Sequence, residues 1–163
     1  MVMKKPLIVF AATSVIVVGI LVWWFSDSQV IKRQTVELAD LFTMSSGDGK
    51  TSRASKNQNL GELLDEKLTC TIDLDEYHGE HGRDSLLEAH LYLGKACESS
   101  SVQASGIEII SLTDNSATVE AEFNILVRTT GGSTYSENSP VTLVWLKNDS
   151  GKWQLSKITL EPR

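Results

Sequence analysis

The most distinctive hydrophobic pattern of the chain is an uncharged, mainly apolar run from Leu7 to Phe25. At a rise of about 1.5 Å per residue, a helix of this length just crosses a hydrocarbon layer ~30 Å thick. Trp23 and Trp24 lie where membrane proteins place interfacial aromatic side chains. The run also ends without the small-x-small pattern that a signal peptidase cleaves. We therefore expect residues 7–25 to be an uncleaved anchor in contact with membrane lipid.

Two lysines set the expected orientation of this anchor. Lys4 and Lys5 precede the run, and positively charged flanks stay on the cytoplasmic side. The sequence thus predicts a single-pass protein of the inner (cytoplasmic) membrane, with residues 1–6 in the cytoplasm. Residues 26–163 would form one extracytoplasmic domain that follows the span without a flexible linker.

The first half of this domain shows helical spacing interrupted by a polar stretch. Apolar residues repeat at helical intervals over 26–44, which predicts a helix there. Residues 45–59 are rich in Ser, Gly and Asn and predict a loop. A short helix is expected next, and the alternation over 69–75 predicts a strand. The leucines expected on one face of that short helix are Leu60, Leu63, Leu64 and Leu68.

The second half predicts one more helix and then strands joined by hairpins. The helix is expected from Asp84 to about Glu98. Strands are expected over 101–114, 116–129, 140–148 and 152–162, with 129–139 as a hairpin connection. The sequence therefore predicts an α+β fold, in which a cone-shaped, curved antiparallel sheet packs on about three helices.

Composition and charge narrow the possible partners. The chain has 163 residues, a net charge of -6 and a pI near 5.0. This length suits one globular domain of ordinary size. The acidic balance, without a basic stripe, argues against a nucleic acid as a partner.

Cys70 and Cys97 are the two cysteines of the chain. In an oxidising compartment an even number of cysteines is compatible with a disulfide, which makes this pair a disulfide candidate. Two buried thiols that pack as small apolar groups are the equally supported alternative.

The acidic stretch 73–84 contains two of the three histidines. His78 and His81, with the neighbouring acids, are chemically able to bind a metal. Gly79 and Gly82 disfavour the helix that would place both rings on one face, so we favour a charged turn between a strand and a helix. The stretch would then lie at the rim of the cone, where loops carry specificity. The residues expected to meet a ligand or partner at this rim are Tyr77, His78, His81 and Arg83.

His90 lies among leucines on the predicted inner face of the third helix. A lone histidine on an apolar face is more often a satisfied core residue, and we favour that interpretation. The alternative is a general base or ligand contact inside the cone. The predicted inward residues of the strands are all apolar, so no acid–base pair accompanies His90.

Two short motifs resemble those of a known group of proteins. The Gly-Arg-Asp at 82–84 precedes the third helix, and Trp145 and Trp153 flank a turn at Gly151. With the element order, these motifs make residues 28–160 resemble the SnoaL-like branch of the nuclear transport factor 2-like superfamily. That resemblance implies a conical sheet that commonly pairs face to face, and a scaffold that carries both enzymes and non-enzymes.

The layout of anchor and cone is also similar to two non-enzymatic groups, the bitopic inner-membrane subunit of type IV secretion systems and the Mce-associated membrane proteins. The sequence thus favours a non-catalytic, membrane-anchored domain without a cofactor, acting as a homo-oligomer or with other envelope proteins. The alternative is an extracytoplasmic small-molecule binder or SnoaL-like isomerase, cyclase or hydratase with its pocket around His90.

Overall fold

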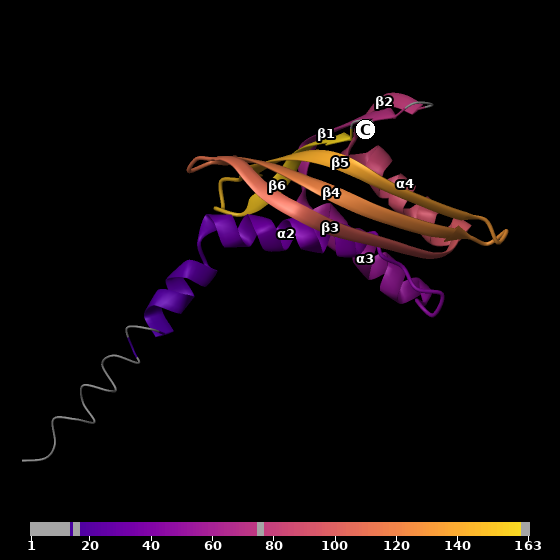
Figure 1. Cartoon of the computed structure of the whole chain (residues 1–163), viewed down its shortest axis with the longest axis horizontal. Coiled ribbons are helices and arrows are strands. Elements are labelled where there is room, and N and C mark those ends of the chain that lie inside the picture. The colour runs from indigo at the N-terminus through magenta and orange to yellow at the C-terminus, as the bar shows by residue number, and fades with distance from the viewer. Residues whose placement is uncertain (1–13, 15–16, 75–76, 161–163) are drawn as a thin grey trace, which may run out of the picture.

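Figure 1 shows the computed structural model of the chain, which describes residue 14 and residues 17–160 except 75–76. Residues 17–24 are helical and point away from a domain built of one sheet and its helices. Within the described residues, no helix combines the length and apolar character needed to cross a membrane. Residues 7–13 and 15–16 of the predicted span 7–25 lie outside the described residues, so the anchor stays a prediction.

Helix α2 (Asp27–Leu41) confirms the first predicted helix of the domain, but it does not continue the helix before it. Ser26 has extended backbone angles (φ -62°, ψ 145°), and its hydroxyl donates to the carbonyl oxygen of Trp23 at 2.7 Å. Arg33 closes the bend, because its Nη1 donates to the Trp24 carbonyl at 2.8 Å and its guanidinium lies 4.7 Å from the Trp24 ring centroid. The bend therefore separates residues 17–24 from the domain.

Helix α3 (Lys50–Leu63) occupies most of the predicted loop 45–59, so that prediction was wrong. Its sequence is polar, and only Leu60 and Leu63 are buried. Side chains along its length instead donate to backbone carbonyls of neighbouring elements. Lys56 donates to Thr43 at 2.6 Å and Asn57 donates to Leu87 at 2.9 Å. These tertiary hydrogen bonds stabilise a helix that hydrophobic periodicity alone does not indicate.

Strand β1 (Leu64–Leu74) begins earlier than predicted, and it pairs antiparallel with strand β2 (Tyr77–Gly82). Leu64 and Leu68, which were expected on a helix, are buried on the strand, because an even spacing also places residues on one face of a strand. The stretch 73–84 is therefore the end of a β-hairpin and the start of helix α4 (Arg83–Ala96), rather than a simple turn.

The last four strands form the predicted meander: β3 (Cys97–Leu112), β4 (Ser116–Thr129), β5 (Thr134–Lys147) and β6 (Trp153–Leu160). The sheet order is β2-β1-β6-β5-β4-β3. The expected all-antiparallel sheet was wrong in one respect, because β1 pairs parallel with β6. The two strands are far apart in sequence, so their relative direction depends on the path of the whole chain between them.

The core lies between the helices and one face of the curved sheet (Figure 1). Along β4 and β5, every second residue in the central part of each strand is buried. Trp145 is completely buried and lies opposite Ala117, which is also buried. Ile31 and Leu38 of α2 and Leu60 of α3 belong to the same cluster. The α+β prediction is thus confirmed.

Candidate functional site

His90 lies on α4 at the point where α2, α3 and α4 meet, and it is 1% exposed. Its Nε2 lies 2.9 Å from the carbonyl oxygen of Leu41 and therefore donates to it. Its Nδ1 lies 3.2 Å from the Asn57 side-chain nitrogen and accepts from it. Phe42 contacts the imidazole edge-on, with ring centroids 5.1 Å apart. Both ring nitrogens are thus used to hold three helices together.

The environment of His90 keeps the imidazole neutral. Burial lowers its pKa, the hydrogen bond to Leu41 works in the opposite direction, and the charge of Lys56 lowers it further. A neutral imidazole whose two nitrogens are occupied by protein groups is poorly placed to take a proton from a substrate. The arrangement fits the core-residue interpretation of His90 better than the catalytic one.

A cavity of about 530 Å³ opens next to His90, between α3 and α4. Three cationic side chains and several apolar ones line it. The cations are Lys50, Arg53 and Lys95, and the apolar residues are Met44, Ala54 and Leu91. The sequence did not indicate this cavity, because it placed the residues around Lys50 and Arg53 in a loop.

The inner sheet face carries polar residues within the segment 129–139, which the sequence predicted to be a hairpin connection. Strand β5 begins at Thr134 rather than at Pro140, so Glu137 and Ser139 lie opposite the inward-facing Ile125 and Phe123 of β4. The Ser139 hydroxyl donates to the Glu137 carboxylate at 2.9 Å. The prediction that the inner face is entirely apolar is therefore wrong at this end of the sheet.

Pro140 explains why the start of β5 was missed. A proline inside a central strand removes a ladder hydrogen bond, so the pattern suggested that the strand begins there. Among the described residues, which end at Leu160, β5 pairs with β6 from Val141 onward, and residues 134–140 pair with β4.

The predicted rim residues take different positions. Arg83 begins α4, and its Nη2 donates to the Gly61 carbonyl of α3 at 2.8 Å, so it helps to dock the two helices. His81 is partly buried on β2, opposite Cys70 of β1. The side chains of Tyr77 and His78 lie outside the described residues. The ligand or partner role of this rim stays a prediction.

The metal alternative at His78 and His81 stays a prediction, because the side chain of His78 lies outside the described residues. Among the residues that the structure describes, no group of three or more His, Cys, Asp or Glu could hold a metal ion.

Cys70 and Cys97 are free and buried. Burial raises the pKa of Cys70 to about 11 and also raises the pKa of Cys97. The strands that carry them, β1 and β3, are separated in the sheet by β6, β5 and β4. In the structure the two cysteines are therefore two buried thiols, which was the alternative to the disulfide.

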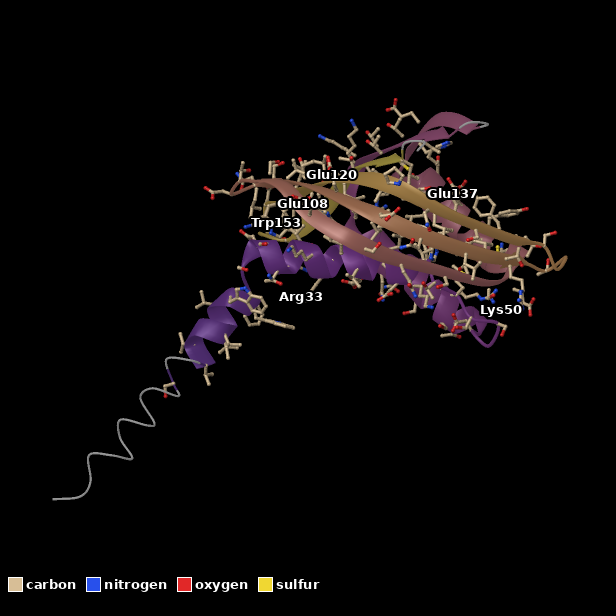
Figure 2. The ribbon with its side chains drawn as sticks, viewed as in Figure 1. Arg33, Lys50, Glu108, Glu120, Glu137 and Trp153 are labelled. Carbon is tan, nitrogen blue, oxygen red and sulfur yellow. The ribbon has the colours of Figure 1, made fainter. Side chains whose placement is uncertain are left out.

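The outer sheet face carries a second hollow, of about 450 Å³. Glu108 of β3 and Glu120 of β4 are direct cross-strand partners on this face (Figure 2). Glu122 and Thr142 also line the hollow. Like charges directly opposite each other repel, so this face favours a cationic group above it.

The comparisons with known proteins concern the fold alone. No protein-family model matches the sequence, and no curated protein matches it. Several solved structures do match. A protein from Novosphingobium aromaticivorans provisionally named a scytalone dehydratase is 16% identical over 82% of each chain, with a TM-score of 0.66. One provisionally named an aromatic ring hydroxylase, from the same organism, is 12% identical over 83% of this chain and 87% of its own, with a TM-score of 0.67.

A third structure names the fold itself. It is a nuclear transport factor 2-like protein with a cystatin-like fold, also from Novosphingobium aromaticivorans. It is 12% identical over 88% of this chain and 86% of its own, with a TM-score of 0.61. The domain therefore has the nuclear transport factor 2-like fold that its sequence motifs indicated.

Proposed function

We propose that the protein is a non-catalytic domain, anchored in the inner membrane with its cone outside the cytoplasm, that binds another protein of the envelope. The observation that carries the non-catalytic part is the state of His90. Its two nitrogens are engaged by Leu41 and Asn57, and no acid contacts it among the described residues. The names of two structural neighbours suggest dehydratase or hydroxylase chemistry, but this histidine lacks a nitrogen free for proton transfer.

The exposed apolar residues before the bend support the anchor. Those described include Val22, Trp23, Trp24 and Phe25, which are 49–69% exposed. In water, such a contiguous exposed apolar stretch would promote aggregation. A bilayer around residues 7–25 would remove it from water, and the bend at Ser26 would then set the angle of the domain to the membrane.

The outer sheet face supports a protein partner. Glu108, Glu120 and Glu122 gather around its hollow, so a partner with a basic patch would be complementary in charge. Two copies stacked through this same hollow would bring their acids together. Charge therefore favours a foreign basic partner on this face over self-pairing through it.

The first experiment is mild-detergent purification of the full chain from its native membrane, followed by sizing and mass spectrometry. We expect the chain in the membrane fraction after a carbonate wash, together with a stoichiometric foreign protein. Glu120→Lys should remove that protein. Glu66→Lys, an equal charge change at an exposed position of β1, should retain it. A chain released by carbonate would contradict the anchor, and a homo-oligomer alone would contradict the foreign partner.

A second candidate function is supported by the cavity beside His90. Its volume of about 530 Å³ falls within the ~300–1,000 Å³ range of small-molecule sites. In this alternative the domain binds a small molecule between α3 and α4. Native mass spectrometry of the purified chain tests it directly, because a bound compound would add a discrete mass.

A further inference from the structure

We propose that the cavity between α3 and α4 binds a small amphipathic carboxylate, a molecule with an apolar body and one anionic head. The proposal rests on the second candidate function above and names its class of ligand. It is argued from the lining of the cavity, its charge and its place in the domain.

The floor of the cavity suits an apolar body. Met44 is 3% exposed and lies at the base, whereas Leu91 is 44% exposed and lies on the outer side of α4. Gly94 also lines the cavity, and a Cβ there would lie 3.4 Å from the sulfur of Met44, at the edge of ordinary van der Waals contact. The apolar body of a small ligand would cover this surface and remove it from water.

The cavity lining concentrates positive charge. Lys50, Arg53 and Lys95 line it, and the described lining residues include no Asp or Glu. In a chain of net charge -6 this concentration of cations is local. Asp48, the acid in the loop just before α3, is engaged by Lys56 at 3.1 Å and by the Ser45 N–H at 2.9 Å, and its charge also interacts with that of Arg53.

The three cationic side chains differ in how freely they can move. Arg53 is held in place, because its Nη1 donates to the Gly94 carbonyl. Lys50 and Lys95 are exposed and can move toward a bound anion. Lys50 is also the first residue of α3, whose first turn contains no acid, so the positive end of the helix dipole adds to the same field. Charge complementarity thus assigns an anion as the head group.

The position of the cavity in the domain bears on whether the ligand comes from the membrane or from solution. Figure 1 shows the start of α3 at the opposite end of the domain from residues 17–24, and Figure 2 marks Lys50 there. A lipid of the bilayer around the proposed anchor would meet the other end of the domain. We therefore assign a free carboxylate from solution as the occupant.

Methionine methyl NMR gives a residue-specific test with octanoate as the probe. The chain has three methionines, and Met44 alone lies in the domain, with Met1 and Met3 at the N-terminus. The full chain, labelled with ¹³C-methyl methionine in phosphatidylcholine nanodiscs, is titrated with octanoate and separately with octanol. We expect a saturable shift of the Met44 signal with octanoate, and at least about tenfold weaker binding of octanol.

Charge reversal at the mobile cations supplies the matched comparison. The double variant Lys50→Glu with Lys95→Glu should weaken octanoate binding by about tenfold or more, since two attractive charges become repulsive. Lys67→Glu with Lys157→Glu makes the same net change at exposed positions of β1 and β6 and should leave binding unchanged. An unshifted Met44 signal in each ligand-free variant shows that the helix pair is intact.

The outcomes separate the two proposals. Equal binding of octanol and octanoate, or an equal loss in both double variants, would overturn the carboxylate assignment while leaving a small-molecule site. A Met44 signal that responds to neither compound would overturn the carboxylate and count against the second candidate function as well.

Discussion

The indole N–H of Trp153 donates to Oδ1 of Asp27 at 2.8 Å, across 126 residues of sequence. The ammonium of Lys147 lies 2.9 Å from the other carboxylate oxygen and 4.8 Å from the centroid of the Trp153 ring. The first residue of α2 is thereby tied to both strands of the β5–β6 hairpin. This three-residue contact fixes the domain end of the bend, because α2 cannot tilt without breaking it.

Removing the indole donor should destabilise the domain modestly. We expect Trp153→Phe to lower the free energy of unfolding by about 1 kcal/mol. This is less than the ~1.5–3 kcal/mol typical of a hydrogen bond to a charged group, because the Asp27 side chain is 41% exposed and water screens its charge. A double-mutant cycle with Asp27→Asn, measured by urea denaturation, should show that the two losses are not additive. Strict additivity would mean that the contact contributes nothing.

The same contact predicts a response to acid. Hydrogen bonds from Trp153 and then Lys147 hold the pKa of Asp27 below its ordinary value of 3.8. The unfolded chain therefore binds this proton first as the pH falls. The stabilisation is complete above pH 3.8 and is lost as the pH falls through the lowered folded value. Urea denaturation between pH 5 and pH 2 should show a shallower acid loss for Asp27→Asn than for the wild type.

His90→Ala should destabilise the domain strongly. It leaves a cavity and removes the partners of Leu41 and Asn57, so we expect a loss of about 2–4 kcal/mol in the free energy of unfolding. Glu88→Ala, at an exposed position of the same helix, should change it by less than about 0.5 kcal/mol. Unchanged stability of His90→Ala in urea denaturation would contradict the core role.

The histidine also predicts a pH dependence near neutrality. Its folded pKa is lowered below 6.5, chiefly by burial, so the unfolded state takes up this proton more readily. Its contribution to stability is complete above pH 6.5 and falls as the pH drops from there toward the folded pKa. Urea denaturation between pH 7.5 and pH 5 should show this slope in the wild type and a reduced slope in His90→Gln.

Thiol labelling should distinguish the two alternatives for the cysteines. Burial raises the pKa of both Cys70 and Cys97, which leaves little thiolate to react at pH 8. We expect iodoacetamide to modify neither cysteine in the native chain and both cysteines in guanidinium without reductant. Modification in guanidinium only after reduction would show a disulfide.

Two substitutions at Trp145 should separate the effect of side-chain volume from the effect of the indole N–H on stability. It is completely buried, and its indole nitrogen has no hydrogen-bond partner among the described residues. Trp145→Phe removes that unpartnered donor as well as some volume, so we expect a change within about 1 kcal/mol. Trp145→Ala should cost about 3–5 kcal/mol, because the ring fills the centre of the core. Thermal and urea denaturation of both variants test this ordering.

Much of the domain follows from local pattern. Alternation over Ser116–Thr129 predicted β4 at its observed bounds, and the helical spacing of apolar residues predicted α2 and α4 to within a few residues. In each case one face is buried against the core, so the period of apolar residues reports the element directly. The motifs around Gly82 and Gly151 are also local sequence patterns, and the nuclear transport factor 2-like fold that they suggested is confirmed.

Other features depend on partners distant in sequence. Helix α3 has little apolar periodicity and forms because Lys56, Asn57 and Arg53 donate to carbonyls of other segments. The parallel pairing of β1 with β6 depends on the whole path between them. The inward position of Glu137 depends on the pairing of residues 134–140 with β4.

The sequence by itself determined the apolar run before the domain, the α+β class and the buried face of each periodic element. Only the tertiary structure decided that both nitrogens of His90 are occupied and that Lys50, Arg53 and Lys95 surround one cavity. The physical reason is that burial of an apolar face repeats along a single element. A hydrogen bond or a cluster of charges is completed by groups from separate elements, and no local period records it.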